Sequence, residues 1–180
     1  MKKCIIILTA ICILLSLNGC TVQKDITASF QPTETSFSID NYHLQITADS
    51  SFREDTGGSY DLQITNDSTY ISIMAYNYID LPVDITPLDV YAFQNEDLCS
   101  KRSAVATIEE PTEQTLPQGT LTRTLFSAEK NGVKNYYASY LIDLPDEKVF
   151  AWVLVTAMPS YLRDNQEYLH NIVCSLAPIA

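Results

Sequence analysis

The stretch VFAWVLVTA, residues Val149–Ala157, decides the fold of this chain. It is apolar at nearly every position, so both faces of a strand built from it must be buried. A strand buried on both faces lies inside a sheet that carries other layers on both sides. The stretch therefore predicts a central strand, with Trp152 in the core.

The segments on either side of this strand have clear local patterns. Thr120–Lys130 and Val133–Leu144 flank the dipeptide Asn131-Gly132, which suits the type I′ turn of a two-residue hairpin. After the central strand, apolar residues over Ser160–Leu176 recur at helical spacing and predict one amphipathic helix.

Two further hairpins are expected in the N-terminal half of the chain. Ser36–Ile39 and Tyr42–Thr47 alternate apolar and polar residues around Asp40-Asn41, which predicts a two-residue turn. Tyr60–Thr65 and Tyr70–Tyr76 repeat the pattern. All four segments are predicted to be antiparallel strands.

A helix is predicted to follow these hairpins. Thr86 can cap its start, Pro87 suits the first helical position, and Asp89 lies near the positive end of the helix dipole. Ala104–Glu109 then has strand character, and the acidic, proline-bearing Glu110–Gln118 is interpreted as a loop.

These elements predict an α+β fold, with an antiparallel sheet and helices on both faces in an α/β/α sandwich. Their order, with the opening hairpin, the Thr86-Pro87 helix, the Asn131-Gly132 hairpin, the apolar strand and the closing helix, is similar to the Mog1/PsbP-like fold. PsbP-related lipoproteins of bacteria have this fold. The resemblance covers residues 35–177 and implies a non-catalytic accessory or binding domain. It brings no site residue with it, because no motif matches.

The N-terminal residues have the order of a secretory signal. Lys2 and Lys3 precede the apolar stretch Cys4–Leu17, and Leu17-Asn18-Gly19-Cys20 follows. This order resembles the signal of bacterial lipoproteins, which implies that Cys20 receives a diacylglyceryl group. The predicted organisation is a signal peptide over residues 1–19, a lipidated cysteine and flexible tether over 20–34, and a single domain over 35–180.

Charge indicates how the protein meets a membrane. The chain has 11 basic and 22 acidic residues, and loss of Lys2 and Lys3 with the signal leaves a net charge of −13. Anionic lipid headgroups repel such a chain, and no basic stripe is present to neutralise nucleic-acid phosphates. We therefore expect lipid anchoring at Cys20, on the extracytoplasmic side of the cell membrane, and no nucleic-acid partner.

No catalytic or metal-binding motif is recognisable. His43 and His170 are the two histidines, and neither has a second histidine at ligand spacing. Asp80, Asp84 and Asp89 do not follow the spacing of a calcium-binding EF-hand loop. Solvated acids are the simpler interpretation, with calcium as the alternative. The sequence predicts no enzyme activity, no cofactor and no metal.

Two residue pairs leave alternatives open. Cys99 and Cys174 either form a disulfide or remain buried free thiols, since their helices could lie on opposite faces of the sheet. Tyr136 and Tyr140 share one strand face. They form either a binding surface or part of an ordinary sheet.

The predicted function is a membrane-anchored extracytoplasmic lipoprotein that acts as a non-catalytic interaction or accessory module. Its expected partner is an envelope protein or peptide. The alternative is a lipoprotein that binds a small molecule or an ion in a pocket between sheet and helix.

Overall fold

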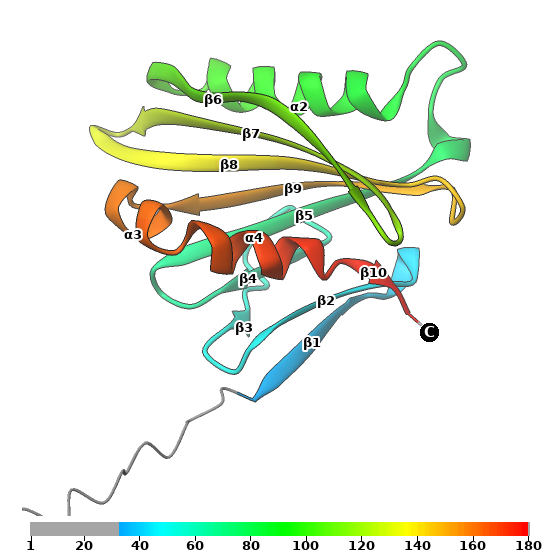
Figure 1. Ribbon diagram of the computed structural model, residues 1–180. Helices are drawn as coiled ribbons and strands as arrows, with labels where there is room; N and C mark the ends of the chain where they lie inside the picture. Colours follow the sequence, from blue (N-terminus) through cyan, green and yellow to red (C-terminus); the bar gives the residue numbers. More distant parts are fainter. Residues whose placement is uncertain (1–32, 180) are drawn as a thin grey trace, which may run out of the picture. The chain divides into compact units, whose positions relative to one another are not determined.

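Strand β9 (Val149–Ala157) is the middle strand of a seven-stranded antiparallel sheet, as predicted. The computed structural model describes residues 33–179 (Figure 1). The strand order of this main sheet is β3-β4-β5-β9-β8-β7-β6. The other strands of the sheet are β3 (Arg53–Glu54), β4 (Leu62–Thr65), β5 (Thr69–Asn77), β6 (Ser103–Leu116), β7 (Gly119–Lys130) and β8 (Val133–Leu144).

A small second sheet and the helices complete the described part of the chain. The small sheet has the order β1-β2-β10. Its strands are β1 (Glu34–Ile39), β2 (Leu44–Asp49) and β10 (Ala177–Pro178). The helices are α2 (Pro87–Ser100), α3 (Pro159–Asp164) and α4 (Gln166–Cys174), with short 3-10 turns η1 (Asp40–Tyr42) and η2 (Tyr78–Asp80).

Both faces of the main sheet are covered, since alternate residues of β9 belong to two separate apolar clusters, one on each face. Phe150, Trp152 and Leu154 pack with residues of α2. Val153 and Val155 belong to the other cluster, which includes residues of α3, α4 and the small sheet. In Figure 1, α4 crosses in front of the strands of the main sheet. The predicted α+β class, with helices on both faces of an antiparallel sheet, is confirmed.

Local sequence patterns account for several of these elements. Asn131 and Gly132 both have positive φ, of 54° and 78°, as a type I′ turn between β7 and β8 requires. Helix α2 begins with a complete capping box, in which the Thr86 side chain accepts from the Asp89 amide and the Asp89 carboxylate accepts from the Thr86 amide.

Three expectations about boundaries were wrong. The turn of the first hairpin is the 3-10 turn η1, and not a two-residue turn. The segment Glu110–Gln118 is not a loop, because β6 continues to Leu116 with irregular pairing along its length. The closing helix is interrupted at Asn165, whose side-chain amide donates to the Tyr161 carbonyl, so α3 and α4 are separate helices.

The predictions for the N-terminal region, including the signal peptide, Cys20 and most of the tether, lie outside the described residues. Among residues 33–179, no helix is long and apolar enough to cross a membrane.

Candidate functional site

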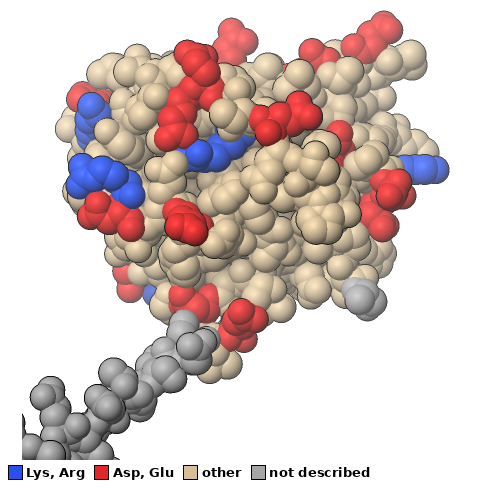
Figure 2. Space-filling view, in the orientation of Figure 1, with Lys and Arg blue, Asp and Glu red and all other residues tan. Residues whose placement is uncertain are grey.

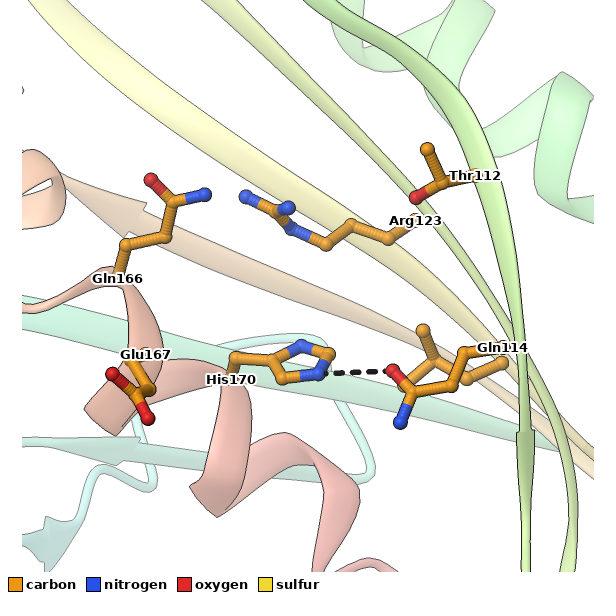
Figure 3. A pocket seen from close by; sticks show the side chains of 7 residues that line it. Thr112, Gln114, Arg123, Gln166, Glu167 and His170 are labelled. Atoms are coloured by element: carbon orange, nitrogen blue, oxygen red, sulfur yellow. Dashed lines mark hydrogen bonds between the residues drawn. The ribbon is translucent and has the colours of Figure 1, made fainter.

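A pocket of about 370 Å³ lies between the β6–β7 hairpin and helix α4 (Figure 3). The strands supply one wall and the first turns of α4 supply the other. The residues that line it are Thr112, Gln114, Leu121, Arg123, Gln166, Glu167 and His170. At the end of the hairpin, the Gln118 amide donates to the carbonyls of Cys174 and Leu176, at 3.1 and 3.0 Å, and joins the hairpin to the end of α4.

Arg123 enters this pocket from a position in β7 that alternation would fill with an apolar residue. Leu121 and Leu125, two residues before and after it, are both buried in the core cluster shared with α4. Because side chains two apart in a strand share a face, Arg123 projects to the same side. Only 13% of its side chain is exposed.

One edge of the Arg123 guanidinium is paired and the other is not. Its Nη1 donates to Glu109 Oε2 at 2.8 Å, and its Cζ lies 5.9 Å from the centre of the Tyr140 ring. Its Nε and Nη2 are buried without a hydrogen-bond partner. Buried donors in native proteins nearly always have a partner, so these two nitrogens mark a place for an acceptor.

His170 enters the pocket from α4. Its Nε2 lies 3.2 Å from Gln114 Oε1 and 3.4 Å from the Cys174 sulfur, whereas its Nδ1 is buried without a partner. Burial, and then the positive charge of Arg123, lower the pKa of His170 below its usual value. The imidazole is therefore neutral at pH 7. In the described part of the chain, the buried side-chain nitrogens and oxygens that lack a partner all belong to Arg123 and His170.

The contact between Cys174 and His170 invites comparison with a catalytic thiol and its base. A nucleophilic cysteine needs a lowered pKa, so that the thiolate forms near neutral pH. Burial instead raises the pKa of the Cys174 thiol. A protonated thiol beside a neutral imidazole is suited to packing and not to attack on a substrate.

Polar groups of mixed charge surround the remainder of the pocket. The Gln166 amide donates to Glu109 Oε1 at 3.3 Å, and in Figure 3 it faces the end of the Arg123 side chain. Glu167 is exposed at the pocket wall, and Leu121 supplies a buried apolar surface. The arrangement can hold a small polar ligand that accepts hydrogen bonds from Arg123.

Of the two alternatives for Tyr136 and Tyr140, the structure favours part of the sheet over a binding surface. Tyr140 is only 1% exposed and lies in the core, and Tyr136 is half-buried against the same cluster. The reason is that α4 covers this face of β8: the Tyr140 ring centre lies 5.9 Å from that of His170. Burial raises the pKa of Tyr140 to about 12. The Tyr140 ring thus packs beside both Arg123 and His170.

The disulfide alternative for Cys99 and Cys174 is also corrected. Both are free thiols in the structure. Cys99 packs against the cluster under α2, and Cys174 packs against the cluster under α4. The main sheet separates these two clusters, so the sulfurs cannot meet.

Sequence reasoning noted His170 but missed Arg123, Gln114 and Gln166. Arg123 did leave a signal in the sequence. The alternation of Leu121 and Leu125 places position 123 on the inward face of the strand, and yet the residue there is charged. The glutamines left none, since contacts between β6 and α4 join positions 56 or 57 residues apart.

A second groove, of about 450 Å³, lies beside the start of α2 and is here called the α2 groove. The ionisable residues that line it, Glu113 and Asp143, are both acidic, and Asp143 accepts a hydrogen bond from the Tyr78 hydroxyl. Among the residues that line it, Leu88 is an exposed apolar side chain. The other large apolar side chains exposed between Tyr78 and Ser100 are Ile79, Val83, Ile85 and Phe93.

Comparison with known proteins identifies the fold. No family model matches the sequence, and no curated protein matches it. Solved structures do match. Cyanobacterial PsbP (CyanoP) from Synechocystis sp. PCC 6803 has a TM-score of 0.60 at 9% identity, covering 90% of this chain and 99% of its own.

Two further solved structures match over most of their length. The Saccharomyces cerevisiae Ran-binding protein Mog1p has a TM-score of 0.55 at 12% identity, covering 82% of this chain and 96% of its own. LpqN of Mycobacterium tuberculosis, involved in cell envelope biogenesis, has a TM-score of 0.55 at 14% identity, covering 89% and 99%. The chain therefore has the Mog1/PsbP-like fold, as the sequence resemblance implied.

Proposed function

We propose that this protein is a membrane-anchored, extracytoplasmic accessory module that binds another envelope protein and catalyses no reaction. The predicted signal peptide over residues 1–19, followed by the predicted lipidation site Cys20, supports the location. The fold supports a binding role by analogy, since Mog1p is a Ran-binding protein and LpqN is involved in cell envelope biogenesis. Fold alone does not identify a partner, so the surface must supply the argument.

The observation that supports the proposal is the exposure of apolar side chains at the α2 groove and in the segment Tyr78–Ser100. Val83 is fully exposed, and Leu88 and Phe93 are 58% and 64% exposed. Exposed apolar residues that gather in one region, with polar residues between them, are typical of protein interaction sites. Helix α2 thus has apolar residues on its outer side that packing against the sheet does not use.

Charge around this surface selects the chemistry of the partner. The segment Tyr78–Ser100 contains five acidic residues and no lysine or arginine, and the α2 groove adds Glu113 and Asp143. Figure 2, drawn from the side of α4, shows that acidic residues outnumber basic ones on that face as well. Complementary charge steers association and selects partners. The partner is therefore a protein segment that carries lysine or arginine beside an apolar anchor.

A photo-crosslinking amino acid placed at Leu88 of the full-length, membrane-bound protein tests the proposal. The expected result is an adduct with an envelope protein, and the crosslinked peptide of that protein is expected to contain lysine or arginine. The yield of this adduct is expected to fall at high salt. Val133, 53% exposed at the distant β7–β8 turn, is the matched control position and is expected to give no such adduct. No adduct at Leu88, or the same adducts from both positions, would contradict the proposal.

A further inference from the structure

In the pocket between the β6–β7 hairpin and α4, one edge of the Arg123 guanidinium has no hydrogen-bond partner. Glu109 occupies Nη1 of Arg123, and the two nitrogens left without a partner, Nε and Nη2, lie on one edge of the group. Two parallel N–H groups on one edge of a guanidinium match the two oxygens of a carboxylate. The free edge of Arg123 is therefore shaped for a carboxylate.

The charge of the pocket argues against a ligand that is only anionic. The charged groups in and beside the pocket are Arg123, its partner Glu109, and Glu167 on the wall formed by α4. His170 adds no positive charge at pH 7, because burial and Arg123 lower its pKa. A phosphate or sulfate would increase an existing excess of negative charge. A ligand that has both a carboxylate and a positively charged group would not add net negative charge, and its positive group could pair with Glu167.

The size and the other walls of the pocket suit a small zwitterion. Its volume of about 370 Å³ is at the lower end of the range for small-molecule sites. Leu121 gives an apolar surface, and the amides of Gln114 and Gln166 can donate or accept hydrogen bonds. His170 Nδ1, buried and unpartnered, adds a further polar contact.

We propose that this pocket binds a free α-amino acid. The amino-acid carboxylate accepts two hydrogen bonds from Nε and Nη2 of Arg123, and the ammonium group faces Glu167. The amino-acid side chain lies against Leu121 and the glutamine amides. The Gln166 amide, which faces the guanidinium in Figure 3, moves aside as the ligand enters.

The test uses the full-length protein in detergent, with each proteinogenic L-amino acid as a probe in thermal unfolding and calorimetry. At least one amino acid is expected to raise Tm as its concentration rises, because binding to the folded state alone stabilises it. For that amino acid, the carboxamide and the deaminated acid are expected to bind about tenfold or more weakly, since each loses contacts to a charged group.

Two variants and a matched control locate the site. Arg123→Lys keeps the charge but loses the paired donors, and is expected to weaken binding about tenfold or more. Glu167→Gln is expected to weaken binding of the amino acid but not of its deaminated analogue. Arg163→Lys, at a side chain 71% exposed on α3, is the control and leaves the affinity unchanged.

Three results would overturn the proposal. One is that no amino acid raises Tm. Another is that an amino acid which raises Tm binds the wild type and Arg123→Lys with equal affinity. The third is a rise in Tm with inorganic phosphate and with no amino acid, which would assign the pocket to simple anions.

Discussion

His170 is a neutral side chain held between an arginine and a buried tyrosine. The titratable and charged groups that face it are Arg123 from β7, Tyr140 from β8 and Cys174 from its own helix. Burial and the Arg123 charge both disfavour the imidazolium, so its pKa is lowered. Protonation of His170 is therefore expected to weaken the packing of α4 against the sheet.

Stability is expected to fall as pH drops below the ordinary histidine pKa of about 6.5, because the unfolded chain then binds a proton that folded His170 resists. Above that pH both states are neutral and the effect vanishes. The variant His170→Gln should show a flatter dependence of the free energy of unfolding on pH between about pH 7 and pH 5. Urea unfolding at a series of pH values measures this slope.

The control for this measurement is the second histidine. His43 is exposed and takes a left-handed conformation after η1, which asparagine also tolerates. The slope of His43→Asn should match that of the wild type. If His170→Gln keeps the wild-type slope as well, the assignment of the pH effect to His170 is wrong.

At the scale of the element, the β6–β7 hairpin depends on one glycine. A Cβ on Gly119 would stand 1.9 Å from the backbone carbonyl oxygen of Asp143 in β8. A backbone atom cannot rotate away, so Gly119→Ala must displace the hairpin from β8. We expect a loss of about 1–3 kcal/mol, as for overpacking in a core, and a fall in Tm of several degrees in a calorimetric scan.

Gly57→Ala is the matched control for this prediction. There the nearest atom is 3.3 Å away and belongs to the flexible Asp55 side chain. The control should change Tm little. A Gly119→Ala protein as stable as the Gly57→Ala protein would show that the hairpin end is free to shift, and the pocket wall with it.

The elements that could be predicted are those whose own residues determine them. Strand β9 was predicted from its apolar run, and the turn at Asn131-Gly132 from its positive-φ residues. The first part of β6 was predicted from Ala104–Glu109, but its continuation to Leu116 was missed. This edge strand is exposed at nearly every position, so its sequence has no apolar alternation. The interruption at Asn165 was missed because the apolar spacing continues across it.

The same distinction applies to the site. The pocket is formed where β6, β7 and α4 meet, and pairing across the sheet sets this arrangement. No local pattern in the sequence places Gln114 beside His170. For Tyr140, the alternation of β8 correctly predicted which residues share a face. It could not show that α4 covers that face, so the choice between a binding surface and the sheet stayed open.

At the scale of the whole molecule, attachment to the membrane is predicted to depend on one thioether at Cys20. The chain without residues 1–19 has a net charge of −13, which anionic lipid headgroups repel. Two acyl chains are sufficient for stable anchoring, whereas one is marginal. We expect Cys20→Ala to move from the membrane pellet to the soluble fraction and to incorporate no labelled palmitate.

Cys12→Ala is the matched control, because Cys12 lies in the apolar part of the predicted signal and leaves with it. This variant should remain in the membrane fraction and take up palmitate as the wild type does. If Cys20→Ala stays in the pellet, the retained signal or a bound partner holds the protein there. Washing that pellet with high salt separates the two, because it releases a protein held by charge and leaves one held by an apolar segment.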